Sequence, residues 1–347
     1  MLAQALKPRR SSLVARLLAG LAPLAAALLA PLAAHAQAVP GNTGVIAVLA
    51  DGFRNPTTVA VKNGVALVAE GQLARLGFLG GLFQAFPVSL QGAGVIADRA
   101  LRVQLPGNDF FPEGIAVDPQ TNDIFVGSIF NGIIEKFPNG QQRQQFAGRV
   151  GTGTLTRGAL GLRVDNARNL LWACDSSLAV AGGTVTGIDL TSRQVVVTHE
   201  LPAGSLCNDI VLDAASNLLV TETLVGQVFR IDAANALTAN SAQLFLATPE
   251  IAPPAAGQLG ANGLAIAGGI LFVSNTFAGT LVRFDLNAAD VAGSVQVVNL
   301  TEGNVASAIL SGPDGVLSIS DTQLLVVENG FAGAGNNRLS LITLDAL

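Results

Sequence analysis

Oxygen-bearing side chains occupy one recurring position in this sequence. Glu113, Asn208, Asn262 and Asp314 each follow the first residue of a segment whose later residues are mostly apolar. Carboxylates that meet at one point repel each other unless a proton or cation lies between them. Oxygen donors without thiol or imidazole suit a hard divalent cation, Ca²⁺ first, with water completing the coordination. The pattern therefore predicts a metal site formed by these four residues, provided that the fold brings them together.

The segments that carry these residues belong to a repeat. Each has a small or polar pair, four alternating apolar positions, a turn, and a second apolar strand that ends in a polar residue. The six segments begin at Pro56, Pro112, Ala159, Cys207, Ala261 and Pro313. A spacing near 50 residues with short strands is typical of propeller blades. At the residue after the start, the remaining two segments have Thr57 and Leu160.

Each repeat continues with a third and a fourth strand, such as IIEKF and RQVVVTHEL. The last repeat ends after three strands, at RLSLITL, and Gly44–Leu49 supplies a fourth from the N-terminal side. We therefore expect an all-β fold, a six-bladed β-propeller with the N-terminal strand closing the last blade. Six in-phase repeats disfavour the alternative of an ordinary β-sandwich. The Gly-, Ala- and Pro-rich residues 71–95 and 246–260 are expected to be loops at one rim.

Residues 1–36 have the pattern of a secretory signal peptide. Basic residues precede the apolar run Leu17–Ala33, and Ala34-His35-Ala36 provides small residues at a cleavage site. A membrane anchor is the weaker alternative, because the run is short and contains prolines. We expect a periplasmic or secreted protein with residues 37–347 as a single propeller domain, and no membrane association after cleavage.

The mature chain would be acidic. Removing four of the 19 Lys and Arg residues leaves 15 against 24 Asp and Glu, a net charge of −9. This charge argues against nucleic acid as a partner and suits a cation site and a small-molecule substrate. Oligomeric state and substrate identity are not indicated by the sequence.

Other reactive residues give weaker signals. Cys174 and Cys207 fall at the same face of neighbouring blades, so either a disulfide or two buried thiols fits them. His199 is expected at the surface of an outer strand. Without another histidine beyond residue 36 and without a G-x-S-x-G motif, a Ser-His-Asp triad is excluded.

A second set of polar residues ends the second strands of four repeats. We expect these residues to bond the turn into the third strand, with Asp175 or Glu222 as alternative neighbours of the ion. The set is Asp175, Glu222, Asn275 and Glu328.

The motifs PEG at 112–114, CND at 207–209, NG at 262–263 and PDG at 313–315 occur in a recognisable order. With them, the mature chain resembles the gluconolactonase, senescence-marker-protein (regucalcin) and paraoxonase superfamily of six-bladed propellers. The resemblance implies that Glu113, Asn208, Asn262 and Asp314 hold the metal and that Asp314 also acts as the catalytic base.

Two positions depart from that family pattern. Leu206 occupies the place of a substrate-binding arginine in gluconolactonases, and Leu160 the place of a histidine in paraoxonases. These leucines disfavour a sugar-acid lactone and predict a more apolar pocket.

The resemblance implies an exported metal-dependent hydrolase that acts on a lactone or related ester. The alternative is a non-catalytic propeller like those built from NHL repeats, with a structural Ca²⁺ ion. A strictosidine-synthase-like propeller is a third and weaker alternative.

Overall fold

The computed structural model describes residues 42–53, 55–70, 86–89, 110–147, 158–177, 180–330 and 337–345. The expected signal peptide, and all of the 71–95 insertion except residues 86–89, lie outside these ranges. Residues from Pro40 to Leu347 form one compact unit. The described part of the chain contains no helix that is long and apolar enough to cross a membrane.

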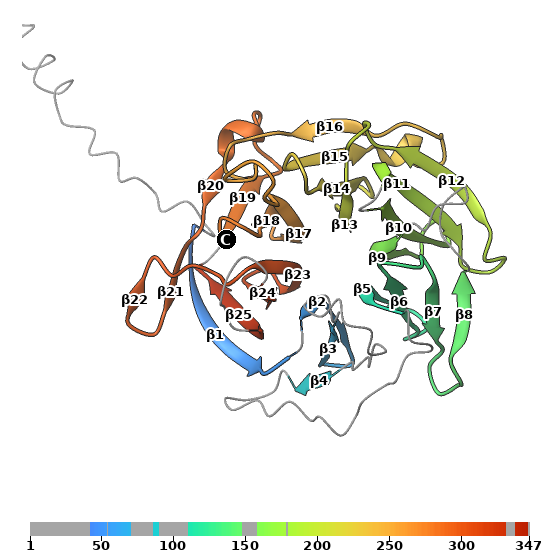
Figure 1. Cartoon of the computed structure of the whole chain (residues 1–347), viewed down its shortest axis with the longest axis horizontal. Coiled ribbons are helices and arrows are strands. Elements are labelled where there is room, and N and C mark those ends of the chain that lie inside the picture. The colour runs from blue at the N-terminus through green and yellow to red at the C-terminus, as the bar shows by residue number, and fades with distance from the viewer. Residues whose placement is uncertain are drawn as a thin grey trace, which may run out of the picture. The chain divides into compact units, whose positions relative to one another are not determined.

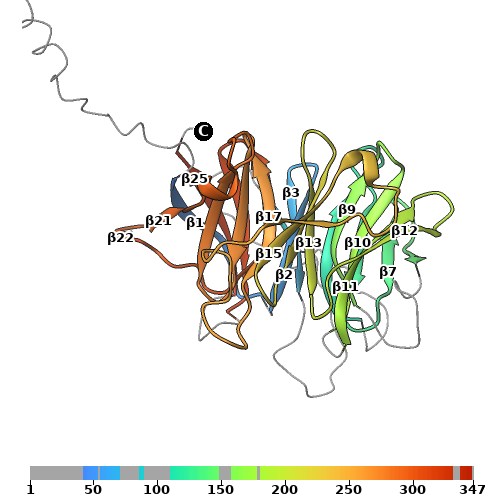
Figure 2. The same ribbon diagram turned by 90° about the horizontal axis from the view of Figure 1, so that it is seen from above.

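The unit is built from antiparallel sheets around a common axis (Figures 1 and 2). Three sheets have four strands each and follow one another along the chain. They comprise β5 (Pro112–Val117), β6 (Ile124–Ser128), β7 (Ile134–Phe137) and β8 (Gln144–Ala147); β9 (Gly158–Asp165), β10 (Leu170–Ser177), β11 (Val180–Asp189) and β12 (Val195–Glu200); and β13 (Cys207–Leu212), β14 (Leu218–Glu222), β15 (Gln227–Ile231) and β16 (Gln243–Leu246).

The next sheet along the chain also has four strands, and two 3₁₀ helices lie in connections. The strands are β17 (Ala261–Ala267), β18 (Ile270–Asn275), β19 (Thr280–Asp285) and β20 (Gln296–Val297). The helices are η1 (Ala233–Asn235) and η2 (Ala292–Ser294). Most of the 246–260 segment, which was expected to be a rim loop, is indeed loop that connects β16 to β17.

The last sheet combines both ends of the described chain. Its order is β22-β21-β1-β25-β24-β23. The strands are β1 (Thr43–Asp51), β21 (Asn299–Glu302), β22 (Val305–Ala306), β23 (Pro313–Ser320), β24 (Gln323–Glu328) and β25 (Arg338–Leu344). β1 runs antiparallel to β25, with Val45 opposite Thr343. Beyond β1 lies β21, which runs parallel to it, so that β21 and β22 extend this sheet past the four strands that the sequence predicted.

The first sheet is the smallest. It contains β2 (Pro56–Lys62), β3 (Val65–Glu70) and β4 (Phe86–Ser89). The all-β propeller is confirmed. Five sheets have the four or more strands expected of a complete blade, against the six predicted, and the described residues give this sheet only three. Its chain continues into residues 90–109, which lie outside the described ranges.

Turn chemistry and alternating apolar residues explain these elements. Asn63 and Gly64 join β2 to β3 with φ angles of 51° and 74°, the left-handed conformation that a two-residue hairpin needs.

Phe125 on β6 and Phe146 on β8 pack edge to face, with ring centroids 4.9 Å apart. They belong to an apolar cluster shared with β9, β10 and β11 of the next sheet. The core therefore lies between the faces of neighbouring sheets, which a single sheet could not bury alone.

One end strand of every sheet borders the axis. In cyclic order, β2, β5, β9, β13, β17 and β23 each contact the next, and β23 contacts β2. Residues at equivalent positions of these strands therefore converge, as the repeat predicted.

Candidate metal centre

A β-bulge recurs at the start of each inner strand. On β13, Cys207 pairs with Glu222 and Ile210 with Val220, so Asn208 and Asp209 together oppose Thr221. The register shifts at the corresponding place on β2, β5, β9, β17 and β23. A bulge re-aims side chains that regular pleating would send to opposite faces. On β13 both bulge residues therefore reach the axis.

Glycine follows the candidate ligand position in most inner strands because the sheets approach closely there. A Cβ atom on Gly114 would collide with the carbonyl oxygen of Leu160 on the next sheet. A Cβ atom on Gly161 would lie 2.5 Å from the Cα atom of Asp209. The absence of side chains thus lets the backbones of neighbouring inner strands converge around the axis.

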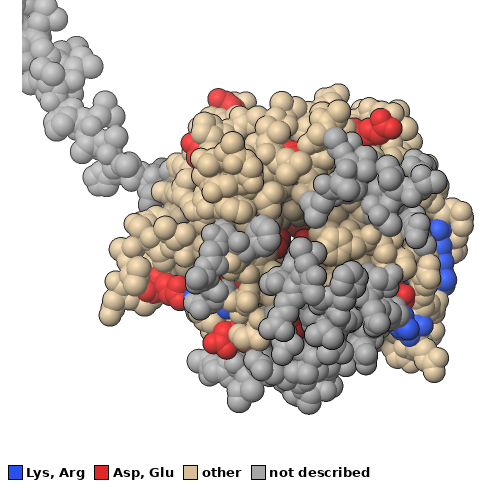
Figure 3. Space-filling view, in the orientation of Figure 1, with Lys and Arg blue, Asp and Glu red and all other residues tan. Residues whose placement is uncertain are grey.

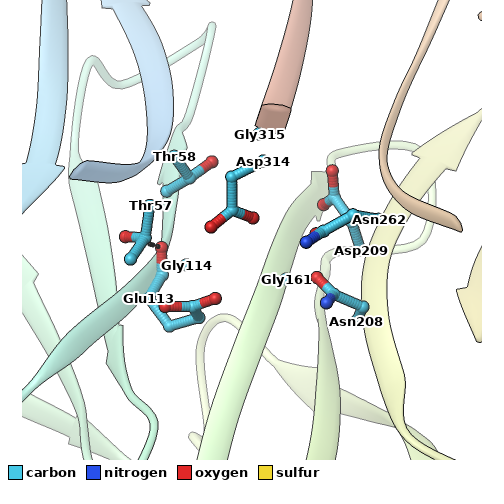
Figure 4. Close-up of a pocket in the computed structure, with 10 residues that line it drawn as sticks. All are labelled: Thr57, Thr58, Glu113, Gly114, Gly161, Asn208, Asp209, Asn262, Asp314 and Gly315. Carbon is cyan, nitrogen blue, oxygen red and sulfur yellow. Dashed lines mark hydrogen bonds between the residues drawn. The ribbon is translucent and has the colours of Figure 1, made fainter. Parts of the chain in front are cut away.

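All four predicted ligands line one pocket, here called the axial pocket. Figure 4 shows the carboxylates of Glu113 and Asp314 and the amides of Asn208 and Asn262 around a shared space. The other lining residues are Thr57, Thr58, Gly114, Gly161, Asp209 and Gly315. The free volume is about 10 Å³, close to that of one water or ion. Acidic atoms are also visible in a central hollow of the molecular surface (Figure 3).

The pocket crowds three carboxyl groups. Burial, reinforced by the charge of Asp209, raises the pKa of Glu113 to about 8. Burial and the charges of Glu113 and Asp209 hold the pKa of Asp314 well above its usual range. Burial raises the pKa of Asp209 to about 6, against hydrogen bonds from two backbone amides and the charge of Arg163. A divalent cation would relieve this repulsion.

Two oxygen atoms in the pocket lack hydrogen-bond partners. They are Oε2 of Glu113 and Oδ1 of Asn262, both buried. The Asn262 side chain is 4% exposed, and its Nδ2 donates to Thr276 Oγ1 at 2.8 Å, which leaves Oδ1 free. Buried acceptors without donors are costly, and a cation satisfies them. The donor set therefore fits a hard divalent ion.

The set mixes two carboxylates with two amides. The described ranges contain no cluster of three or more His, Cys, Asp or Glu residues arranged to hold a metal. Calcium sites accept amide oxygens as well as carboxylates, so the mixed set remains compatible with Ca²⁺.

Hydroxyl groups hold the main chain of the candidate ligands from the preceding sheet. Thr221 Oγ1 donates to the carbonyl oxygen of Asn262 at 2.5 Å, and Ser274 Oγ to that of Asp314 at 2.9 Å. Thr57 Oγ1 donates to the carbonyl of Glu113 at 3.1 Å. Near Asn208, Ser176 Oγ donates to the carbonyl of Cys207 at 3.0 Å. These bonds fix the ligand backbones against neighbouring sheets.

Sequence reasoning missed Asp209 and Thr58 as lining residues. Asp209 is the third residue of the CND motif, and regular alternation would have turned it away from Asn208. The bulge that reverses this expectation has no clear sequence signature beyond the glycines at equivalent positions.

The two leucines do not form the apolar pocket that was predicted. Neither lines the axial pocket. Leu160 is 2% exposed and packs in an apolar cluster with Cys174 and Cys207. Leu206 is also buried, and its N–H donates to Glu222 Oε1 at 3.1 Å. At blade three the bulge presents Gly161 to the axis instead of Leu160.

His199 is fully buried, which contradicts the expected surface position. Its Nε2 is 3.0 Å from the carbonyl oxygen of Ala236, and its Nδ1 accepts from the Ser241 N–H at 3.2 Å. The ring lies near Trp172, with centroids 6.0 Å apart. The reason is that the chain after η1 covers β12, so the outer strand is not exposed there.

Cys174 on β10 and Cys207 on β13 form a disulfide, with Cα atoms 5.2 Å apart. The bridge links the second strand of one sheet to the inner strand of the next sheet, directly before Asn208. The sequence left open a disulfide or two buried thiols, and the structure contains the disulfide.

The polar residues that end second strands bond nearby turns, as expected for Glu222 and Asn275. Glu222 Oε1 accepts from Leu224 N at 2.8 Å, and Asn275 Oδ1 from Ala278 N at 3.2 Å. Neither Asp175 nor Glu222 lines the axial pocket.

Comparison with known proteins identifies the class of fold. No protein-family model and no curated protein matches the chain. Among similar solved structures, a luciferin-regenerating enzyme is 10% identical with a TM-score of 0.60, and the match covers 88% of this chain and 97% of that one. The calcium-binding protein regucalcin from Agrobacterium tumefaciens is 11% identical with a TM-score of 0.57, and the match covers 88% of this chain and 97% of that one. A streptogramin B lyase is 11% identical with a TM-score of 0.55, and the match covers 89% of this chain and 100% of that one. The expected resemblance to this group of propellers is confirmed at the level of the fold.

Proposed function

We propose that the protein is a metal-dependent hydrolase of the gluconolactonase type that acts on a lactone or related ester. The observation that carries this proposal is the convergence of Glu113, Asn208, Asn262 and Asp314 on one ion-sized pocket with unpartnered oxygen atoms. The similar fold of regucalcin, a calcium-binding protein, supports Ca²⁺ as the ion.

Bound in this pocket, a divalent cation would supply a Lewis acid that stabilises negative charge on a carbonyl oxygen. Glu113, Asn208, Asn262 and Asp314 would hold it. Asp314 would accept a proton from the attacking water through its carboxylate. Asn329 Nδ2 donates to Asp314 Oδ2 at 2.7 Å. This bond would orient the carboxylate as a metal ligand and as a general base.

We further propose that the three-stranded sheet β2–β4 is the first of six blades. The closed cycle of contacts among the six inner strands supports this count. In the last blade, β1 would close the ring by its pairing with β25.

Export to the periplasm or the medium, with cleavage after Ala36, is part of the same proposal. The Cys174–Cys207 disulfide supports it, because disulfides persist in oxidising compartments. N-terminal sequencing of the mature protein tests it: Gln37 should be the first residue, and an intact Met1 would contradict export by cleavage.

The enzymatic proposal is tested with a panel of lactones and esters, assayed with calcium and with a chelator. We expect activity that the chelator removes and calcium restores. Asp314→Asn should lower kcat by about 100-fold or more, the usual contribution of a general base. Asp290→Asn is the matched control, because Asp290 is exposed and accepts a hydrogen bond from Gly293 N. Chelator-resistant turnover, or unaltered turnover in Asp314→Asn, would contradict the proposal.

A non-catalytic propeller with a structural ion is the second candidate. It is favoured by the pocket lining, in which no described residue is His, Lys or Arg. An ion bound only to the folded state stabilises it by mass action. A large calcium-dependent rise in Tm without turnover on any substrate of the panel would favour this candidate.

A further inference from the structure

In two sheets, the residue opposite the β-bulge reaches the ligand of the next sheet. This residue is Thr221 on β14 and Ser274 on β18. Their hydroxyls donate to the carbonyl oxygens of Asn262 and Asp314, respectively. The position opposite the bulge is therefore an anchor for the proposed ligand that follows in the cycle of sheets.

Cys174 holds this position on β10. The register of β10 against β9 shifts between Ala173 and Asp175, so Cys174 alone opposes the bulge of β9. In place of a hydroxyl it has a sulfur atom, which is bonded to Cys207, the residue before Asn208. The anchor of this sheet on the next one is therefore covalent.

A neighbouring hydrogen bond confirms that the two kinds of anchor occupy equivalent places. The hydroxyl of Ser176 donates to the carbonyl oxygen of Cys207 at 3.0 Å. Two sheets further on, Thr276 donates to the carbonyl oxygen of Pro313, also at 3.0 Å. Cys207 and Pro313 each directly precede a proposed ligand. The contacts to the next sheet thus match, except that a disulfide replaces one hydroxyl.

The glycines of the two bulges also match. Gly161 and Asn208 face the axial pocket from neighbouring inner strands (Figure 4). A Cβ atom on Gly161 would lie 2.5 Å from the carbonyl oxygen of Asn208, and one on Gly263 would lie 2.3 Å from that of Asp314. The carbonyl of Asn208 therefore lies where a hydroxyl at position 174 could donate to it.

We propose that the Cys174–Cys207 disulfide positions Asn208 for the ion, so that disulfide formation and metal binding strengthen each other. This inference rests on the proposed metal site. Disulfide formation transfers two electrons and two protons from the two cysteine thiols to a disulfide oxidant, which becomes a dithiol. The coupling is reciprocal: the factor by which the disulfide raises the ion affinity is the factor by which a saturating ion stabilises the disulfide.

The test uses the mature protein and Ca²⁺, with calorimetry for the ion affinity and dithiothreitol for the thiol–disulfide equilibrium. Reduction of the disulfide should weaken Ca²⁺ binding by about tenfold, as is typical when a group that orients a metal ligand is lost. Saturating Ca²⁺ should raise, by the same factor, the ratio of reduced to oxidised dithiothreitol at which half of the protein is reduced.

Three variants separate positioning from loss of the bridge. Cys174→Ala with Cys207→Ala should bind Ca²⁺ as weakly as the reduced wild type. Cys174→Ser with Cys207→Ala introduces a hydroxyl anchor like that of Ser274, and its affinity should return to within about threefold of the oxidised wild type. Leu170→Ala truncates a buried side chain at the other end of β10 and should change the affinity by less than about threefold. If the forms without the disulfide unfold in plain buffer, the affinities are measured in trimethylamine N-oxide, which favours the compact state.

Several results would overturn this inference alone. They are equal Ca²⁺ affinities of the oxidised and reduced wild type, a thiol–disulfide equilibrium that Ca²⁺ does not shift, and a serine variant that binds no tighter than the alanine pair. A loss in Leu170→Ala as large as that on reduction would also overturn it, because stability and not position would then control the affinity. Failure of the oxidised wild type to bind Ca²⁺ would instead overturn the metal site itself.

Discussion

Three of the four proposed ligands, Glu113, Asn262 and Asp314, accept a hydrogen bond at their carbonyl oxygen from a hydroxyl group of the preceding sheet. The hydroxyl of Thr221 binds the carbonyl of Asn262, and that of Ser274 binds the carbonyl of Asp314. Residues that orient metal ligands commonly matter to affinity almost as much as the ligands do. At the scale of the residue, the site is therefore a product of contacts between sheets.

Thr221→Val preserves shape and removes the hydroxyl that binds Asn262. Because Thr221 is fully buried, the lost bond should lower the free energy of unfolding by about 1–3 kcal/mol. Calcium affinity should fall by about tenfold, because the Asn262 backbone is released. Denaturant titration with chelator and calorimetry with calcium measure the two effects. Ser318→Ala, which removes an exposed hydroxyl bonded to Ser320 O, is the control. Equal calcium affinity in Thr221→Val and wild type would contradict the positioning role.

At the scale of the element, the outer strand β12 is covered by the chain that follows η1. His199 connects the two, through Ala236 on one side of its ring and Ser241 on the other. Nδ1 accepts a hydrogen bond from Ser241 N. A proton on Nδ1 would point at the Ser241 N–H and break this hydrogen bond. The contact therefore requires a neutral imidazole.

This requirement predicts a pH dependence of stability. Burial lowers the pKa of His199 from its usual 6.5, so the unfolded chain takes up the proton more readily. The stability from this contact is complete above pH 6.5 and is lost as the pH falls below it. His199→Gln should remove that part of the dependence. The measurement is the unfolding free energy of both proteins between about pH 5 and 8, and parallel curves would contradict the role of His199.

At the scale of the whole molecule, the two ends of the described chain share the last sheet. β1 contributes Ile46, which is 4% exposed, to a cluster with Leu300, Ile342 and Leu344. This cluster also contains residues of β17 and β18 in the neighbouring sheet. If β1 closes the ring, its core contact should stabilise the entire propeller.

Ile46→Ala should therefore lower the free energy of unfolding by about 2–5 kcal/mol, in a single cooperative transition. Val45→Ala is a matched control on the same strand. Val45 is 55% exposed, so its truncation should change stability by no more than about 0.5 kcal/mol. Chemical denaturation followed by tryptophan fluorescence reports the global transition, since Trp172 lies in a distant sheet. A loss of the same size in both variants, or none in either, would argue against closure by β1.

The repeat predicted the inner strands and the four candidate ligands, because periodic apolar residues determine which strand borders the axis. Each repeat was expected to continue into a single fourth strand, but after residue 294 the structure has two short strands, β20 and β21. β20 stays in its own sheet, and β21 crosses to pair with β1. Asp209 was missed because a bulge changes which face a residue occupies without changing composition. The burial of His199 depends on the loop after η1, and alternating apolar residues in the strands carry no information about the position of this loop.

The most direct test of the central claim is an anomalous difference map from crystals of the mature protein grown with calcium. We expect one peak in the axial pocket, about 2.3–2.6 Å from oxygen atoms of Glu113, Asn208, Asn262 and Asp314. A pocket with no anomalous density at saturating calcium, or an ion bound elsewhere without these four side chains, would contradict the proposed metal centre.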